Sequence, residues 1–241
     1  MITPYSQTGM NESPSDGPNL NETAYRAIKG DIIACVLQPG EEISEGVLVA
    51  RYGFSKAPIR SALVRLRQEG LIVSRGRQGN IVSPVTLRDV QEVFQLRLLL
   101  EVAAARLAAG RVDPERIREL NRVVHAGFSP GEPSSEAAYL EANREFHRYV
   151  AEAAGNQRLA ALLVDLMEQH ERIVHLGLAL QSRGHEFVHF HDNLVNALVD
   201  GDADLAAKLT ERALRGGQQK VLEALLASGN QVSVAGVAPE R

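Results

Sequence analysis

The stretch 44–84 constrains the fold most, because its pattern predicts two short helices around a tight turn, followed by two short strands. Ser44 and Ser55 are the expected N-caps of the two helices, and Gly53 can end the first. The expected elements are helices at 44–52 and 56–69, and strands at 71–73 and 81–82 on either side of a Gly-rich tip. This order predicts a winged helix-turn-helix with a small β-wing.

The same stretch carries a local excess of positive charge. Between residues 51 and 84, seven Lys and Arg side chains stand against one acid, Glu69, a balance of +6. The whole chain has a net charge of −4, so the remaining residues carry about −10. A basic island in an acidic protein is typical of a polyanion-binding surface. Double-stranded DNA is therefore the expected partner.

In a helix-turn-helix, the N-terminal residues of the second helix contact base edges in the major groove. Arg and Lys suit guanine, Ser suits phosphate or base, and Ala can contact a thymine methyl group. A wing with basic side chains and bare glycine backbone suits phosphates or the minor groove. The alternative is an ordinary amphipathic helix with a solvated basic face. The predicted DNA-contacting residues are Ser55, Lys56, Ala57 and Arg60 in the helix, and Arg75, Arg77 and Gly79 in the wing.

From Thr86 onward the sequence shows only helical periodicity. Thr86 can open the first helix, and Pro114 occupies the first position of the second. The expected helices cover about 87–109, 114–126, 135–154, 156–182, 186–200 and 203–227. The expected fold class is therefore mainly α, with an antiparallel helical bundle after the winged helix-turn-helix. Such bundles hold pockets lined from several helices.

Two parts of the chain resemble the GntR family of bacterial transcription regulators. The segment LQPGEEIS…LVARYGFSKAPIRSALVRLRQEGLIVSRGRQGNIV is similar to the N-terminal domain of that family. The helical half resembles the FadR branch through VFQLRLLLE near Arg97, REFHRYVAEAAGN near His147 and HDNLVNALVDGD near His191. The resemblance implies an all-helical ligand-binding domain after the DNA-binding domain. It places these residues at DNA-contacting positions: Ser55, Lys56, Ala57, Arg60 and Gly79.

Two positions depart from the family pattern. Lys56 stands where Arg is usual, which removes a bidentate fork of donors. Gly46 stands where some members have a DNA-contacting Arg, so no such role is expected of it.

The predicted organisation has two domains and two tails. Residues 21–84 form the DNA-binding domain and 86–228 the effector-binding and dimerisation domain, between a disordered tail at 1–20 and a flexible tail at 229–241. Cys35 is the single cysteine and lies in an apolar run, which indicates a buried side chain in a reducing compartment. No segment has the length of a membrane span, and the N-terminus lacks the pattern of a signal peptide. A cytoplasmic location is expected.

Three polar residues of the helical half are expected to point into its interior. Asn143 and His147 are four residues apart, hence on one helical face, and that face also carries apolar side chains. His191 shares a face with Leu194 and Leu198. Buried imidazoles are plausible ligands of zinc, nickel or copper. The competing interpretation is a buried histidine satisfied within the core.

Some members of the FadR branch bind a divalent metal through an Asp-x-x-x-His pair and one His on each of two later helices. By this resemblance His147 and His191 are ligands, whereas Asn143 replaces the Asp and Ala213 replaces the third His. His170, on an apolar helix face, is the remaining candidate ligand. A divalent transition metal such as zinc or nickel, held by Asn143, His147 and His191, is therefore one alternative.

The other alternative is an anion site without metal. Arg97 lies in the middle of an apolar helix, resembles a pocket residue of the family and could clamp a carboxylate. An ion pair with Glu101, four residues later, is the competing interpretation. The predicted effector-binding residues are Arg97, Asn143, His147 and His191, with a small carboxylate as ligand. The histidines expected in loops or at the surface are His125, His175, His185 and His189.

The function that these expectations support is a DNA-binding transcriptional repressor, acting as a homodimer and controlled by a small anionic metabolite. A metal-dependent hydrolase fused to a DNA-binding module is one alternative, but the sequence contains no HExxH, GxSxG, P-loop or GxGxxG motif. Glu145 is expected to point off the face of the candidate ligands, which leaves no general base. No enzymatic activity is expected. A ligand-independent DNA-binding dimer is the second alternative.

Overall fold

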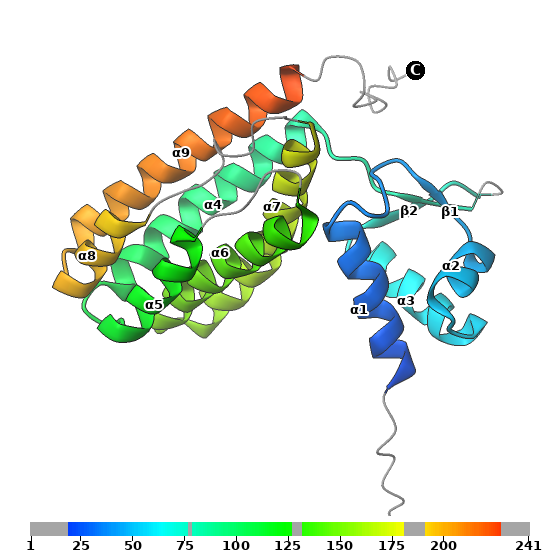
Figure 1. Ribbon diagram of the computed structural model, residues 1–241, viewed down its shortest axis with the longest axis horizontal. Helices are drawn as coiled ribbons and strands as arrows, with labels where there is room; N and C mark the ends of the chain where they lie inside the picture. Colours follow the sequence, from blue (N-terminus) through cyan, green and yellow to red (C-terminus); the bar gives the residue numbers. More distant parts are fainter. Residues whose placement is uncertain (1–18, 77–78, 127–131, 181–190, 228–241) are drawn as a thin grey trace, which may run out of the picture.

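The computed structural model describes residues 19–76, 79–126, 132–180 and 191–227. Arg77, His185, His189, the tail at 229–241 and nearly all of the tail at 1–20 lie outside the described residues. Figure 1 shows two groups of elements side by side, with α1 of the N-terminal group next to α7 of the helical group.

The described part of the N-terminal group contains three helices and a three-stranded antiparallel sheet (Figure 1). Its elements are α1 (Leu20–Ile33), β1 (Glu42–Ile43), α2 (Glu45–Tyr52), α3 (Lys56–Gln68), β2 (Ile72–Ser74) and β3 (Asn80–Val82). The strand order is β1-β3-β2, and both Glu42 and Val73 lie opposite Ile81 of the central strand. The winged helix-turn-helix predicted from the sequence is confirmed.

The end of α1 and the first strand differ from the expectation. The apolar pattern up to Leu37 predicts a longer helix, but α1 ends at Ile33. Cys35 adopts a φ of 54°, a left-handed conformation that an α-helix cannot continue through. The chain then turns so that the Leu37 N–H donates to the Asp31 carbonyl, which brings Leu37 into the core. No sequence pattern predicts β1, because two residues are too few to show a period.

The helical group surrounds one long helix, α4, which contacts α6, α7 and α9. Its described elements are α4 (Leu87–Ala108), α5 (Pro114–His125), α6 (Pro133–Ala153), α7 (Gln157–Leu180), α8 (Asp192–Asp200) and α9 (Ala203–Ala227). Thr86 and Asp89 form a capping box at the start of α4, as the sequence predicts for Thr86. The predicted helix at 186–200 is described only from Asp192 onward. The antiparallel bundle is confirmed.

Each group has its own apolar core. Ile28, Ile59 and Leu66 are fully buried in the N-terminal group, and Phe94 and Phe146 are among the largest buried side chains of the helical group. The thiol of Cys35 is buried as predicted, and burial raises its pKa. Within the described residues, we find no helix with the length and apolar character of a membrane span.

Candidate DNA-binding surface and ligand cavity

The recognition helix α3 begins with exposed side chains at the four predicted positions. Ser55, Lys56, Ala57 and Arg60 are exposed, whereas Pro58 and Ile59 between them are buried against the N-terminal core. Ser55 occupies the N-cap position, but its side chain makes no capping hydrogen bond. The prediction that Ser55 is the N-cap residue of α3 is confirmed, although its hydroxyl does not bond to the first-turn amides.

Arg60 is oriented by an ion pair with the preceding helix, α2. Its Nε atom lies 2.8 Å from Oε2 of Glu45, the first residue of α2. Ser44 caps α2 by accepting a hydrogen bond from the Val47 N–H, and Gly53 ends it with a φ of 73°. The short turn between Gly53 and the start of α3 brings the two helices together, so that Glu45 at the start of α2 reaches Arg60 of α3. The contacts with Glu45 use Nε, and the two terminal guanidinium nitrogens of Arg60 are the donors that suit a base edge.

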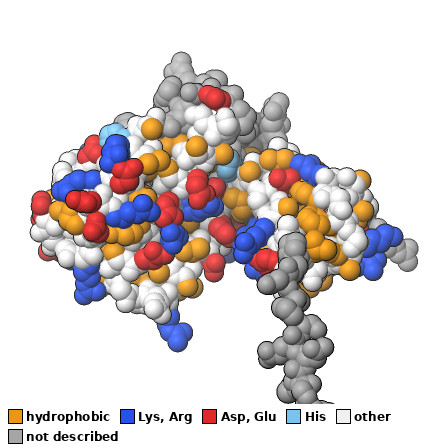
Figure 2. All heavy atoms as spheres, turned by 60° about the horizontal axis from the view of Figure 1, so that its bottom comes forward, with side chains coloured by type: hydrophobic (Ala, Val, Ile, Leu, Met, Phe, Trp, Pro, Cys, Tyr) orange, Lys and Arg blue, Asp and Glu red, His pale blue; other side chains and the backbone are white. Residues whose placement is uncertain are grey.

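The wing is closed by backbone bonds around its glycines. Gly79 has a φ of 95°, which disfavours any residue with a Cβ, and its carbonyl accepts a hydrogen bond from the Arg75 N–H. Arg75 is exposed, and Arg67 of α3 contacts Asn80 of β3 at 2.9 Å. Figure 2 shows Lys and Arg side chains at the end of the N-terminal group that lies away from the helical group. The predicted wing residue Arg77 lies outside the described residues.

The helical group contains a small cavity of about 40 Å³. All four predicted effector residues line it, and so do His170 and Ala213, the two other positions considered for the metal site. The centroids of the His147 and His191 rings are 5.2 Å apart, and the rings are nearly perpendicular. His191 also stacks on Phe146 at 4.3 Å. The cavity is lined by Phe94, Arg97, Tyr139, Leu140, Asn143, His147, His170, Val174, His191, Ala213, Leu214, Gly217 and Val221.

Arg97 both lines the cavity and pairs with Glu101, so the two interpretations of its role are compatible. Its Nε atom lies 2.5 Å from Oε1 of Glu101, and both side chains are buried. The other oxygen, Oε2, lies 3.0 Å from Nδ1 of His147. Burial would raise the pKa of Glu101, but the charge of Arg97 and the contact with His147 outweigh it and lower the pKa to about 2. Sequence reasoning found the pair with Arg97 from its spacing and missed the contact with His147.

The cavity offers a limited set of metal ligands. His191 precedes α8 as its N-cap residue rather than lying within the helix, which corrects its expected placement on a helical face. Asn143 has a buried Oδ1 atom without a hydrogen-bond partner among the described residues. Ala213 lines the cavity without offering a donor atom, and His170 contributes a third imidazole. In the part of the chain that the structure describes, no group of three or more His, Cys, Asp or Glu residues is arranged to hold a metal ion.

The histidines expected at the surface differ from one another. His125, at the end of α5, is exposed and contacts Asp192 at 2.8 Å. His175 lies within α7 with a side chain only 14% exposed, so the expectation of a surface or loop position is wrong for this residue. Burial lowers the pKa of His175. Glu145 pairs with Arg148 at 2.7 Å.

Two family models match the chain. The model described as bacterial regulatory proteins of the gntR family matches residues 20–82, and the FCD domain model matches residues 92–216.

Solved structures share the fold. The E. coli McbR/YncC structure superposes with a TM-score of 0.72 at 20% identity and covers 88% of this chain and 99% of its own. A GntR regulator from Rhodococcus sp. RHA1 gives a TM-score of 0.69 at 19% identity, over 85% and 98% of the two chains.

Relatives with curated names are also transcriptional regulators. The HTH-type transcriptional repressor RspR of E. coli K12 is 25% identical over 206 residues, which is 86% of this chain and 89% of RspR. YdhC of Bacillus subtilis, named an HTH-type transcriptional regulator, is 28% identical over 146 residues, 58% of this chain and 62% of its own. The protein therefore belongs to the GntR family of bacterial regulatory proteins, with an FCD domain after its DNA-binding domain, and is a transcriptional regulator rather than an enzyme.

Proposed function

We propose that the protein is a cytoplasmic repressor that binds its operator as a homodimer and whose operator affinity is controlled by a small anionic metabolite in the helical cavity. One observation carries this proposal. Arg97 of α4, Asn143 and His147 of α6, and His191 before α8 lie far apart in sequence and line one cavity. The recognition helix meanwhile exposes residues suited to DNA.

The chemistry of the cavity favours a carboxylate. The Nη1 and Nη2 atoms of Arg97 have no hydrogen-bond partner among the described residues, and they can form a bidentate pair with a carboxylate. Asn143 can donate through its amide, and the imidazoles of His147 and His191 can donate as well. A volume of about 40 Å³ admits only a few water-sized groups. We expect a metabolite larger than a simple acid to shift the lining side chains, which would link binding to a change in shape.

A bound transition metal is the second candidate, and the contact between Glu101 and His147 favours it. Metal-bound histidines usually place one ring nitrogen on a carboxylate and the other on the metal. Zinc or nickel held by His147, His191 and the Asn143 amide, with His170 nearby, would supply a positive charge for the carboxylate of the effector. Asn143 is a weaker ligand than Asp, and Ala213 cannot ligate, so we favour the version without metal.

The proposal of a dimer rests on the chemistry of DNA recognition, and the proposal of repression rests on similarity to a named repressor. One recognition helix covers few base pairs, so two copies on a pseudo-palindromic operator supply the specificity that one lacks. RspR, with which this chain shares 25% identity, is named a repressor.

A thermal-shift screen of small carboxylates, sugar acids and acyl compounds, each with and without chelator, tests the proposal. A ligand that raises the unfolding temperature and also changes affinity for an operator selected from random DNA supports it. Loss of the shift in chelator selects the metal version. If no compound of these classes raises the unfolding temperature, although the protein binds its operator tightly, the ligand-independent dimer is the better description.

A further inference from the structure

Helix α7 contacts both the effector cavity and the DNA-binding domain. His170 and Val174 form part of the wall of the effector cavity. Other residues of the same helix, one to five positions before His170, face a second cavity of about 340 Å³ between the helical group and the N-terminal group. This second cavity is lined by Tyr25, Lys29, Ile33, Arg65, Glu69 and Leu71 on one side and by Asp165, Glu168 and Gln169 of α7 on the other.

Lys29 of α1 forms an ion-pair bridge across this second cavity. Its Nζ atom lies 2.6 Å from Oε2 of Glu168 on α7 and 3.1 Å from Oε2 of Glu69. The Lys29 side chain is only 18% exposed. Burial would lower its pKa, but the hydrogen bonds that Lys29 donates to Glu168 and Tyr25 outweigh burial and raise the pKa, so Lys29 stays charged. The bridge is therefore a partly desolvated charge cluster rather than a solvated surface pair.

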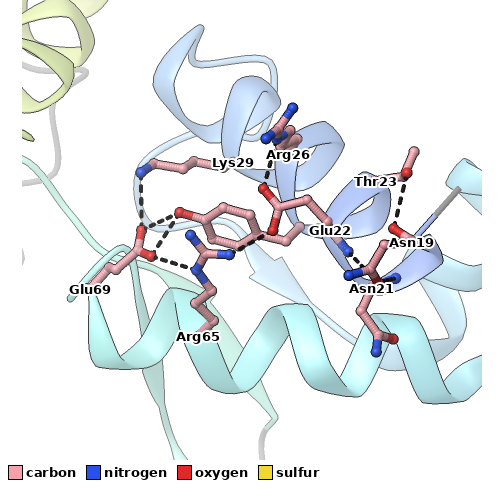
Figure 3. A network of polar contacts seen from close by, with 9 residues as sticks. Asn19, Asn21, Glu22, Thr23, Arg26, Lys29, Arg65 and Glu69 are labelled. Atoms are coloured by element: carbon pink, nitrogen blue, oxygen red, sulfur yellow. Dashed lines mark hydrogen bonds and ion pairs between the residues drawn. The ribbon is translucent and has the colours of Figure 1, made fainter.

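Glu69 connects this bridge to the recognition helix, because it is the C-cap residue of α3. Its carboxylate also accepts a hydrogen bond from the Tyr25 hydroxyl at 2.7 Å and contacts Arg65 Nε at 3.2 Å. The guanidinium of Arg65 in turn lies 3.5 Å from the centre of the Tyr25 ring. Figure 3 shows both Lys29 and Arg65 reaching the carboxylate of Glu69. The end of α3 is thus fixed in position, and Lys29 joins it to α7.

A second contact of α7 reaches the segment between the two domains. Arg172 is 6% exposed, and its guanidinium donates to the Ser83 carbonyl just before α4. The Cys35 thiol lies 3.7 Å from the Arg172 carbonyl oxygen. Between Glu168 and Arg172, α7 therefore contacts α1 directly, the end of α3 through Lys29, and the segment between the two domains. The opposite face of α7, with His170 and Val174, lines the effector cavity.

We propose that α7 transmits occupancy of the effector cavity to the recognition helix through the bridge from Glu168 to Lys29 to Glu69. Displacement of His170 and Val174 by a ligand moves Glu168 on the same rigid helix, and Lys29 carries that movement to the end of α3. Lys29 and Glu168 are positioning residues in this scheme and contact neither DNA nor ligand. The inference rests on the proposed function only in taking the helical cavity as the effector site.

A tethered carboxylate can act as the probe in place of the unidentified effector. Ala213 lines the cavity and is exposed, so Ala213→Cys can be alkylated with iodoacetate to place a carboxymethyl group there. Cys35, the single native cysteine, is 6% exposed, and mass spectrometry shows whether one group or two are added. Operator affinity is then measured by fluorescence anisotropy before and after alkylation of the full chain.

The alkylation should change operator affinity by about fivefold or more when the bridge is intact. In Lys29→Met and in Glu168→Gln backgrounds the change should fall below about twofold, with the same degree of alkylation. Arg26→Met is the matched control, because Arg26 lies on the same helix and, among the described residues, pairs with Glu22 and not with α7, so the full change should remain. A full change in the Lys29→Met and Glu168→Gln backgrounds would overturn the proposal.

Failure of the proposed function gives a different result. If alkylation leaves operator affinity unchanged in the otherwise unaltered chain, the cavity is not the effector site. The bridge is then tested by a double-mutant cycle, in which operator affinity is measured for the Lys29 and Glu168 variants without the carboxymethyl group. Lys29→Met and Glu168→Gln together should change affinity no more than the larger single effect, because both break one connection. Additive effects, or none at all, would show that the bridge does not position α3.

Discussion

Nδ1 of His147 lies 3.0 Å from Oε2 of Glu101, while the other oxygen of the same carboxylate holds Arg97. One buried acid on α4 therefore orients two of the residues that line the helical cavity. Because Nδ1 faces Glu101, Nε2 on the opposite side of the ring is available to the cavity. The charge of Arg97 is balanced before any ligand enters, so the cavity needs no permanent counter-ion.

Glu101→Gln should lower the free energy of unfolding by about 3–5 kcal/mol, because it leaves the buried charge of Arg97 without a partner. Urea unfolding of the variant measures the loss. Glu92→Gln is the matched control, since Glu92 also pairs with an Arg four residues away on α4 but in solvent. That control should lose less than about 0.5 kcal/mol. Equal losses in the two variants would contradict the role given to Glu101.

The same carboxylate predicts a dependence of stability on pH. The pKa of Glu101 is lowered in the folded state from 4.5 to about 2. An acid with a lowered folded pKa contributes stability above its unfolded pKa and loses it as pH falls toward the folded pKa. The stability difference between the unaltered chain and Glu101→Gln should therefore shrink as pH falls from 4.5 to about 2. A difference that stays constant across this window would show that Glu101 is not ionised in the folded protein.

Arg60→Ala should weaken operator binding by about 1–3 kcal/mol and relax the preference for one base pair, because Arg60 is expected to contact a base edge. Binding to the selected operator and to random DNA, measured side by side, tests this. Arg215→Ala removes an exposed Arg on α9 and should leave both affinities unchanged. If Arg60→Ala weakens both DNAs equally, Arg60 contacts a phosphate instead.

Arg75→Ala should act on the salt dependence of binding rather than on sequence preference. Each lost phosphate contact lowers the slope of log affinity against log salt by about one. Titrations of the operator at several salt concentrations measure the slope. An unchanged slope would remove Arg75 from the DNA interface.

Arg97→Lys should weaken the response to the effector, because Lys keeps the charge opposite Glu101 but lacks the planar fork for a carboxylate. In the version without metal, chelator has no effect and His147→Ala only reduces ligand affinity. In the version with metal, His147→Ala removes both metal content and response. Metal analysis of the purified protein, together with ligand titrations of both variants, separates the two. A normal response in Arg97→Lys and in His147→Ala would contradict both versions.

The features that the sequence predicted correctly depend on residues close together in the chain. The exposed start of α3 follows from the polar residues on both sides of Pro58 and Ile59, and the start of α4 follows from the cap at Thr86. The inward orientation of Asn143 and His147 follows from their spacing on one helix. Each of these patterns lies within a few residues, so the sequence alone was sufficient to predict them.

Tertiary packing decided the contacts between residues distant in sequence. Strand β1 exists because β3 lies beside it, and α1 ends early because Leu37 has to return to the core. The contact of His147 with Glu101 and the bridge from Lys29 to Glu168 join helices that no local period relates. Which faces meet depends on how whole helices pack and on the loops that connect them. The sequence therefore specified most of the helices, and only the packed structure specified where α1 ends and which charges face each other across the helices.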